Sequence, residues 1–208
     1  MITIVDSGIA NIGSVCSAFD RIGVQTEVVC DPAAINLAGA LILPGVGSFT
    51  DGMDSLRRNG LDAPICQAGQ AGIPILGICL GMQLLAELSE EFGEHQGLGL
   101  IAGRVVPLVP AKPGERVPNI GWCKVNNKEE SRLFRGIDSG AFFYFMHSFF
   151  LKCTHPGDMA GDIFFGCSSA CVAVERGNLF GVQFHPEKSQ DPGLQLLHNF
   201  VQLAYGKR

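Results

Sequence analysis

The sequence predicts an α/β fold in which a mostly parallel sheet is covered by helices on both faces. Apolar runs alternate with amphipathic helical segments through the first half of the 208 residues, as in βα units. From about Leu98, short strand candidates follow one another between Gly, Pro, Asn and Asp residues. We therefore expect a β-rich, mixed or antiparallel extension of the sheet in the second half.

The first half supplies four predicted strands and the helices between them. The strands are expected at residues 2–5, 26–29, 40–43 and 73–78, the third ending at Pro44. Helices are expected at residues 11–22, 53–58, 62–71 and 80–88. Asn11 is a suitable N-cap for the first helix and Gly23 a suitable C-cap.

The second half is predicted to be a series of strands closed by one helix. The strands are expected at residues 101–109, 122–125, 142–145, 149–153, 163–165, 170–174 and 179–184, and the helix at residues 194–204. The sequence contains no internal repeat, low-complexity stretch or linker. A chain of this length is normally one domain, so we expect residues 1–208 to form a single domain.

Composition and charge exclude several classes of function. Lys and Arg number 15 against 20 Asp and Glu, a net charge of −5, and the longest basic run is Arg57-Arg58. Nucleic-acid binding requires clustered basic residues, so we expect none. Neither a secretory signal nor a run of about 20 apolar residues is present, so we expect a cytoplasmic protein without membrane contact. Of the eight cysteines, Cys167 and Cys171 make a poor zinc pair and no second pair follows, so no metal site is predicted.

A candidate nucleophile stands between an apolar strand and an apolar helix. The segment Gly77-Ile78-Cys79-Leu80-Gly81 has the spacing of a nucleophile elbow, with Cys in place of Ser. Glycines two residues before and two after relieve crowding at the tight turn. The helix that follows directs the positive end of its dipole at the sulfur, and the N–H of Leu80 is the expected oxyanion donor. In isolation, this motif also fits a buried cysteine beside turn glycines.

A candidate base and its carboxylate partner follow the last predicted strand. Pro186 favours an extended conformation for His185, and in extended backbone residues i and i+2 point to the same side. Glu187 could then bond one ring nitrogen of His185 and leave the other free for the proton of Cys79. His147 is a rival base, but it lacks a nearby carboxylate and a structural or pocket-lining role fits it better.

At this point the sequence resembles the triad class of glutamine amidotransferases. Within that class it is similar to the glutaminase subunits of imidazole glycerol phosphate synthase. The similar segments are residues 6–11 (DSGIAN), 43–47 (LPGVG), 77–83 (GICLGMQ), 89–91 (SEE), 121–122 (GW), 145–148 (FMHS) and 183–190 (QFHPEKSQ). The resemblance implies a flavodoxin-like, doubly wound fold and glutamine as substrate. It also implies a (β/α)8-barrel cyclase subunit as partner, which uses the ammonia in histidine biosynthesis.

The resemblance carries further roles onto particular residues. Matching motifs place Gly47, Gln83 and Glu91 near the bound glutamine, and the Val46-Gly47 peptide region supplies the second oxyanion donor. Gln83 lies four residues after Cys79, so on a helix the two would share a face. The implied reaction is attack by the thiolate, release of ammonia and hydrolysis of a glutamyl thioester. Such acyl transfer requires no cofactor.

Three residues depart from the family pattern. Ser7 stands where family members often have Tyr or Thr. Asn119 and Cys123 stand where His and Asn are expected, in a segment that belongs to the family's face towards the cyclase. The three proposed triad residues show no departure.

Three other functions remain open at the level of sequence. The chain could be the glutaminase of another synthase, such as that for anthranilate or aminodeoxychorismate. It could be a cysteine peptidase or esterase on a similar fold. It could also be a non-catalytic regulatory module, although an intact Cys79, His185 and Glu187 set argues against that reading.

Overall fold

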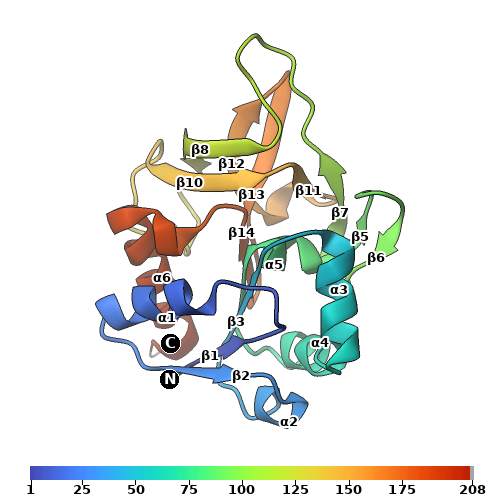
Figure 1. The fold of residues 1–208 in the computed structure, drawn as a ribbon. Helices are drawn as coiled ribbons and strands as arrows, with labels where there is room; N and C mark the ends of the chain where they lie inside the picture. The colour runs from blue at the N-terminus through green and yellow to red at the C-terminus, as the bar shows by residue number, and fades with distance from the viewer. Residues whose placement is uncertain (207–208) are drawn as a thin grey trace.

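The computed structural model describes residues 1–206, and its largest element is an eight-stranded sheet (Figure 1). Its strands are β1 (Ile2–Val5), β2 (Thr26–Val29), β3 (Leu41–Gly45), β4 (Ile75–Cys79), β9 (Asn126–Asn127), β12 (Met159–Phe165), β13 (Ser168–Arg176) and β14 (Leu179–Val182). The order is β2-β1-β3-β4-β14-β13-β12-β9. Strands β2 to β14 are parallel, and those from β14 to β9 are antiparallel. The parallel part has the flavodoxin-like order 2-1-3-4-5, which confirms the predicted fold class.

Helices cover both faces of the parallel strands (Figure 1). One face carries α1 (Ile12–Arg21) and α6 (Gln190–Tyr205); the other carries α2 (Pro32–Ile35), α3 (Phe49–Arg58), α4 (Asp62–Gln70) and α5 (Leu80–Leu84). Because successive strand residues point to opposite faces, Ile4 joins the core under α1 and α6 while Val5 joins the other core. The first helix begins at the predicted cap, since the Asn11 side chain accepts from the Ser14 N–H.

Six further strands, two of which lie before Leu98, form two additional sheets instead of extending the main one. A four-stranded sheet contains β11 (Phe149–Cys153), β7 (Ile101–Pro107), β5 (Ala86–Ser89) and β6 (His95–Gln96). A two-stranded antiparallel sheet pairs β8 (Asn119–Lys124) with β10 (Phe142–His147). The β8–β10 pair lies across the molecule above α1 and α6, and the long loop between β7 and β8 projects beyond it (Figure 1).

The helix predicted at residues 80–88 is wrong beyond Leu84. The carbonyl of Leu84 accepts from Leu98 N–H, and that of Leu85 accepts from Leu100 and Ile101. A continuing helix would need these carbonyls for its own i+4 bonds. Pairing with residues 98–101 instead converts the chain into strand β5, which starts at Ala86.

Strand β3 continues through Pro44, although the sequence predicted that it would end there. Beyond Ile42 its register partners lie only on β4, with Pro44 opposite Ile78. A residue without an N–H is tolerated where one neighbouring strand has already ended. The extra residues carry the chain to Gly45, beside the end of β4 at Cys79.

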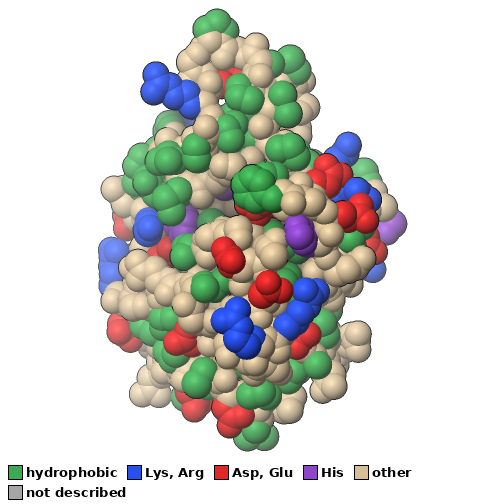
Figure 2. All heavy atoms as spheres, turned by 45° about the vertical axis from the view of Figure 1, so that its right-hand side comes forward, with side chains coloured by type: hydrophobic (Ala, Val, Ile, Leu, Met, Phe, Trp, Pro, Cys, Tyr) green, Lys and Arg blue, Asp and Glu red, His purple; other side chains and the backbone are tan. Residues whose placement is uncertain are grey.

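Figure 2 shows the face that carries α3 and the β5–β6 hairpin, where acidic and basic side chains are intermixed. Arg104, for example, bonds Glu90 at 3.0 Å and Glu94 at 3.4 Å. In residues 1–206, no helix has both the length and the apolar character needed to cross a membrane.

Candidate active site

The sharp turn between β4 and α5 places Cys79 in a strained conformation. Its φ of 55° and ψ of −112° lie in a region that non-glycine residues rarely adopt. Cys79 ends the strand and is also the N-cap of the short helix Leu80–Leu84. The predicted elbow is therefore the local structure of the chain at this point.

Both elbow glycines are required by close backbone contacts. A Cβ on Gly77 would lie 2.6 Å from the carbonyl oxygen of Gly81. A Cβ on Gly81 would overlap the carbonyl oxygen of Leu43 on the neighbouring strand. The first contact lies within the turn, between its two glycines. The second lies between the turn and strand β3.

His185 and Glu187 form a buried pair on the segment that follows β14. The Nδ1 of His185 lies 2.8 Å from Oε1 of Glu187, and their side chains are only 4% and 2% exposed. Strand β10 holds this segment in place: His185 N–H donates to the Tyr144 carbonyl, and the Tyr144 N–H donates to Ser189 Oγ. Ser189 Oγ in turn donates to the His185 carbonyl at 2.6 Å.

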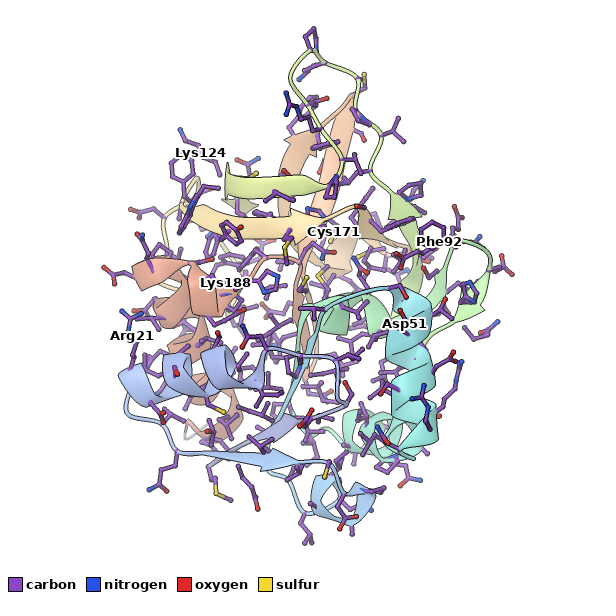
Figure 3. The ribbon with its side chains drawn as sticks, in the orientation of Figure 1. Arg21, Asp51, Phe92, Lys124, Cys171 and Lys188 are labelled. Atoms are coloured by element: carbon purple, nitrogen blue, oxygen red, sulfur yellow. The ribbon has the colours of Figure 1, made fainter. Side chains whose placement is uncertain are left out.

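Lys188, the residue after Glu187, lies between α6 and β10 (Figure 3), and its Nζ is 5.9 Å from the ring centroid of Tyr144.

The electrostatic environment of His185 favours its protonated form. Burial lowers the pKa of His185, but the nearby Cys79 sulfur and the hydrogen-bonded Glu187 carboxylate outweigh burial and raise this pKa from 6.5 to about 9. The other ring nitrogen, Nε2, is buried without a hydrogen-bond partner. Hydrogen bonds between catalytic groups are often long in the absence of substrate. His185 thus has one nitrogen fixed by Glu187 and the other free on the side of Cys79.

A cavity of about 220 Å³ opens beside the Cys79 sulfur. Its walls contain all the residues to which the sequence assigned oxyanion or glutamine-binding roles. The lining residues are Val46, Gly47, Cys79, Leu80, Gln83, Glu91, Pro118, Met146, His147, Ser148, Phe149 and Gln183. A larger hollow, of about 730 Å³, lies under residues 127–139 on another part of the surface and contains none of these residues.

Two glutamine side chains line the cavity next to Cys79. Gln83 Nε2 donates to the Phe149 carbonyl at 3.0 Å and to Gln183 Oε1 at 2.9 Å. Gln183 Nε2 lies 3.9 Å from Cys79 Sγ. The sequence analysis missed Gln183, although a polar residue at the end of an apolar strand, two before His185, was a usable signal.

The backbone donors of the site differ in their availability. The Val46 N–H donates to the Ile9 carbonyl at 2.9 Å and is therefore engaged in this conformation. The next residue, Gly47, has a φ of +98°, which lets the loop turn beside the cavity. Leu80 begins the helix, where N–H groups have no partner within the helix.

The Glu91 carboxylate is held by a backbone hydrogen bond at the start of α3. It is only 8% exposed, and its Oε2 accepts from the Phe49 N–H at 2.6 Å, at the start of α3. Its backbone N–H donates to Ser89 Oγ. This carboxylate therefore lies in the cavity wall with a fixed orientation, where it can attract a substrate ammonium group.

His147 lines the cavity and is buried, as expected of a pocket-lining residue. Its Nδ1 lies 2.9 Å from the Phe149 carbonyl and its Nε2 3.1 Å from Asn119 Nδ2. Burial and the nearby charge of His185 lower the pKa of His147 to about 4, although its bond to Phe149 acts in the opposite direction. In residues 1–206 no cluster of three His, Cys, Asp or Glu side chains could hold a metal ion.

Comparison with known proteins shows the family to which the chain belongs. The model of the class I glutamine amidotransferase family matches residues 3–203. The chain belongs to that family. It is 47% identical to the imidazole glycerol phosphate synthase subunit HisH of Moorella thermoacetica, over 98% of this chain and 95% of that one. The HisH subunit of Sulfurimonas denitrificans is also 47% identical, with 97% of each chain covered.

Solved structures of amidotransferases share the fold at low sequence identity. A crystal structure of a glutamine amidotransferase matches with a TM-score of 0.77 at 20% identity, covering 98% of both chains. PurLQS from Thermotoga maritima matches with the same TM-score at 18% identity, also over 98% of each chain. These similarities support the fold of the amidotransferase described above.

Proposed function

We propose that this amidotransferase hydrolyses glutamine with Cys79 as nucleophile, His185 as general acid and base, and Glu187 as the residue that orients His185. The observation that carries this proposal is the buried 2.8 Å bond between His185 and Glu187, beside a strained Cys79 that lines a cavity. The whole chain would act as one glutaminase domain.

The reaction begins with attack of Cys79 Sγ on the side-chain amide carbon of glutamine. Protonated His185 donates its Nε2 proton to the departing ammonia, and a glutamyl thioester remains on sulfur. His185, now neutral, takes a proton from water as that water attacks the thioester. Glutamate leaves, and the sulfur and imidazole return to their starting states.

Backbone groups stabilise the tetrahedral oxyanions of both steps. The Leu80 N–H is the first proposed donor, because it belongs to the residue after the nucleophile and begins a helix. The Val46–Gly47 region supplies the second. Val46 would have to release the Ile9 carbonyl to donate from its own N–H, whereas Gly47 needs no such exchange.

The remaining wall residues would hold the glutamine. The Glu91 carboxylate is suited to the substrate's α-ammonium group, and the Gln83 amide is suited to its polar atoms. A cavity of about 220 Å³ is suited to an amino-acid-sized molecule such as free glutamine. No step needs a metal or an organic cofactor, since sulfur, imidazole and N–H groups supply all the chemistry.

We further propose that the ammonia is used by a (β/α)8-barrel cyclase subunit, in an imidazole glycerol phosphate synthase of histidine biosynthesis. Relatives at 40–47% identity are named HisH, a subunit of that synthase, rather than glutaminases of anthranilate or aminodeoxychorismate synthesis. The assembly would be a heterodimer.

The exposed side of the β8–β10 sheet is the proposed docking face for the cyclase. Trp122 packs edge-on against Tyr144 with ring centroids 5.9 Å apart, and Trp122 remains 45% exposed. Further exposed apolar residues on this side are Ile120, Phe142 and Met146. Exposed aromatic clusters of this kind are typical of protein interfaces. The Tyr144 carbonyl also accepts from the His185 N–H, so a cyclase bound at this face would contact a strand that holds the proposed catalytic base.

Co-purification and a glutamate-release assay test this function together. The wild-type chain should bind the cyclase subunit of the same organism and release glutamate faster when cyclase and its nucleotide substrate are both present. Trp122→Asp should abolish co-purification. Leu37→Asp is the matched control, because Leu37 is 88% exposed and follows α2 at the opposite end of the molecule. A lone chain that already works at full rate would contradict the coupled role.

A further inference from the structure

A line of hydrogen bonds connects strand β8 with the wall of the glutamine cavity. It starts at Asn119, the first residue of β8, which pairs with His147 in the antiparallel register. The Asn119 side-chain nitrogen lies 3.1 Å from Nε2 of His147, and the opposite ring nitrogen lies 2.9 Å from the Phe149 carbonyl. The same carbonyl accepts the 3.0 Å bond from Gln83.

The line continues from Gln83 to the nucleophile. The Gln83 amide nitrogen donates to Gln183 Oε1 at 2.9 Å, and Gln183 Nε2 lies 3.9 Å from Cys79 Sγ. Gln83 and Gln183 are 6% and 0% exposed, so water does not compete for these bonds. The position of the Gln83 amide therefore depends on where the Phe149 carbonyl is held.

The donors and acceptors of this line can be assigned without ambiguity. A carbonyl oxygen only accepts, so Nδ1 of His147 carries a proton and donates to Phe149. An amide nitrogen only donates, so Nε2 of His147 accepts from Asn119. Burial keeps the pKa of His147 near 4, which leaves the ring neutral with this single proton. Asn119 and the Phe149 carbonyl therefore favour the same tautomer of His147.

The orientation of the Asn119 amide is fixed from both ends. Its oxygen lies 3.6 Å from Sγ of Cys123, which can donate to it. A reversed amide would present its oxygen to Nε2 of His147, and both ring nitrogens would then need protons. A second charged imidazole near protonated His185 in a buried site is strongly disfavoured.

We propose that Asn119 is a positioning residue for glutamine hydrolysis, which holds the His147 ring so that the ring fixes the Phe149 carbonyl and, through it, Gln83. The proposal rests on the glutaminase function proposed above. A histidine at this position could make the same donation to Nε2 from a ring N–H, so Asn119→His is a substitution that retains the donor.

The titratable groups around His147 come from several elements. His185 follows β14 and lowers the pKa of His147 by its charge. Cys79 at the end of β4 and Glu91 after β5 line the same cavity. Cys123 on β8 contacts the far side of Asn119, and burial raises the pKa of the Cys123 thiol. Cys123 therefore remains a neutral S–H donor near pH 7.

The kinetic test compares substitutions that remove or retain the donor at position 119, with the cyclase and its nucleotide at saturation. Asn119→Leu should raise the KM for glutamine about tenfold, the value of one buried hydrogen bond, and change kcat less than threefold. Asn119→His should keep KM within about twofold of the wild type. Asn126→Leu is the matched control, because Asn126 is exposed on β9, the next strand along the chain. The KM of this variant for glutamine should equal that of the wild type.

The spectroscopic test reads the His147 ring directly in the isolated protein labelled with ¹⁵N-histidine. The His147→Gln variant assigns the signals by their loss. At pH 7 the wild type should show a neutral ring protonated at Nδ1. Asn119→Asp should make the ring doubly protonated, because a carboxylate accepts from Nε2. Asn119→Leu leaves the Phe149 carbonyl as the only group of this pair that fixes the tautomer, so a fraction of the rings should become protonated at Nε2.

A wild-type ring protonated at Nε2 would overturn the proposal, and so would an Asn119→Leu variant with unchanged KM. A fall in kcat alone would also contradict it, since the pocket would then be intact. Failure of the proposed function looks different: the wild type itself would release no glutamate with cyclase and nucleotide present. A KM effect confined to Asn119→Leu, with Asn126→Leu and Asn119→His normal, would support the positioning role.

Discussion

The carboxylate of Glu187 lies 2.8 Å from the ring of His185, two residues before it, and both side chains are almost fully buried. Pro186 between them starts a short 3-10 turn, Pro186–Lys188, after an extended His185 with φ −100° and ψ 94°. An ion pair formed by neighbours in sequence needs little long-range organisation. What the fold must supply is only the approach of Cys79 to the other ring nitrogen.

This buried pair predicts a pH dependence of stability. The folded-state pKa of His185, about 9, exceeds the ordinary 6.5, so its contribution is fully present below pH 6.5 and lost as pH rises through 9. The loss should be on the order of 2–3 kcal/mol in the free energy of unfolding, measured with urea between pH 6 and 10. Glu187→Gln removes one cause of the raised pKa and should flatten this decline. Identical profiles for both proteins would contradict the assignment.

The close contacts at the elbow glycines predict that one added methyl group at this turn strongly destabilises the folded protein. Gly81→Ala places a Cβ where the Leu43 backbone carbonyl lies. It should lower the free energy of unfolding by about 3 kcal/mol or more, or prevent folding. Gly13→Ala is the control, because Gly13 is exposed in helix α1 and no atom lies within 4 Å of the added methyl. The Gly13→Ala substitution should raise the free energy of unfolding by about 0.5–1 kcal/mol. Urea unfolding of both variants measures the contrast, and a tolerated Gly81→Ala would show that β3 can move away from the elbow.

The eight thiols predict two different labelling patterns. Iodoacetamide should react first with Cys30 and Cys167, which are exposed. A chloroketone shaped like glutamine should instead modify Cys79, which is buried but lines the cavity beside His185. Mass spectrometry of the two labelled proteins distinguishes these patterns. Dominant labelling of Cys16, Cys66 or Cys123 by the glutamine-like reagent would rule out the elbow as its site.

The elbow and the His-Pro-Glu segment could be predicted because their determinants are local. A glycine pair around Cys79 and the i, i+2 spacing of His185 and Glu187 are visible in a few consecutive residues. The alternation of apolar strands and helices predicted the parallel sheet for the same reason. Helix α5 was predicted too long because its end depends on residues 98–101, which take the carbonyls of Leu84 and Leu85.

The Asn119–His147 contact had no comparable signal. The two residues are 28 positions apart, and only the register of β8 against β10 brings them together. The division of the second half into three sheets was missed for a similar reason, since antiparallel pairing depends on loops that the apolar pattern does not encode. Gln183 is an intermediate case. Its place at the end of an apolar strand is visible in the sequence, but its contact with Gln83 depends on how the chain folds.

The last prediction separates ammonia production from ammonia use in the complex with the cyclase. If Cys79 only makes ammonia, Cys79→Ala should abolish product formation from glutamine and leave formation from added ammonium salts intact. Triad members act as a unit, so His185→Ala should also lose on the order of 10³-fold or more in glutamine-dependent rate. Glu187→Gln keeps the shape of the side chain but lowers the stabilisation of protonated His185, so a smaller loss is expected.

Both activities are measured on each purified complex, with Leu37→Asp as a surface control that should match the wild type in both. A Cys79→Ala complex that still used glutamine would mean that another residue is the nucleophile. One that lost the ammonia-dependent reaction as well would indicate that the substitution disturbs the elbow, where the Cys79 backbone has a φ of 55°, and through it the interface with the cyclase. Retention of the ammonia-dependent reaction alone assigns Cys79 to the glutaminase step, because the barrel then needs nothing from this chain except ammonia.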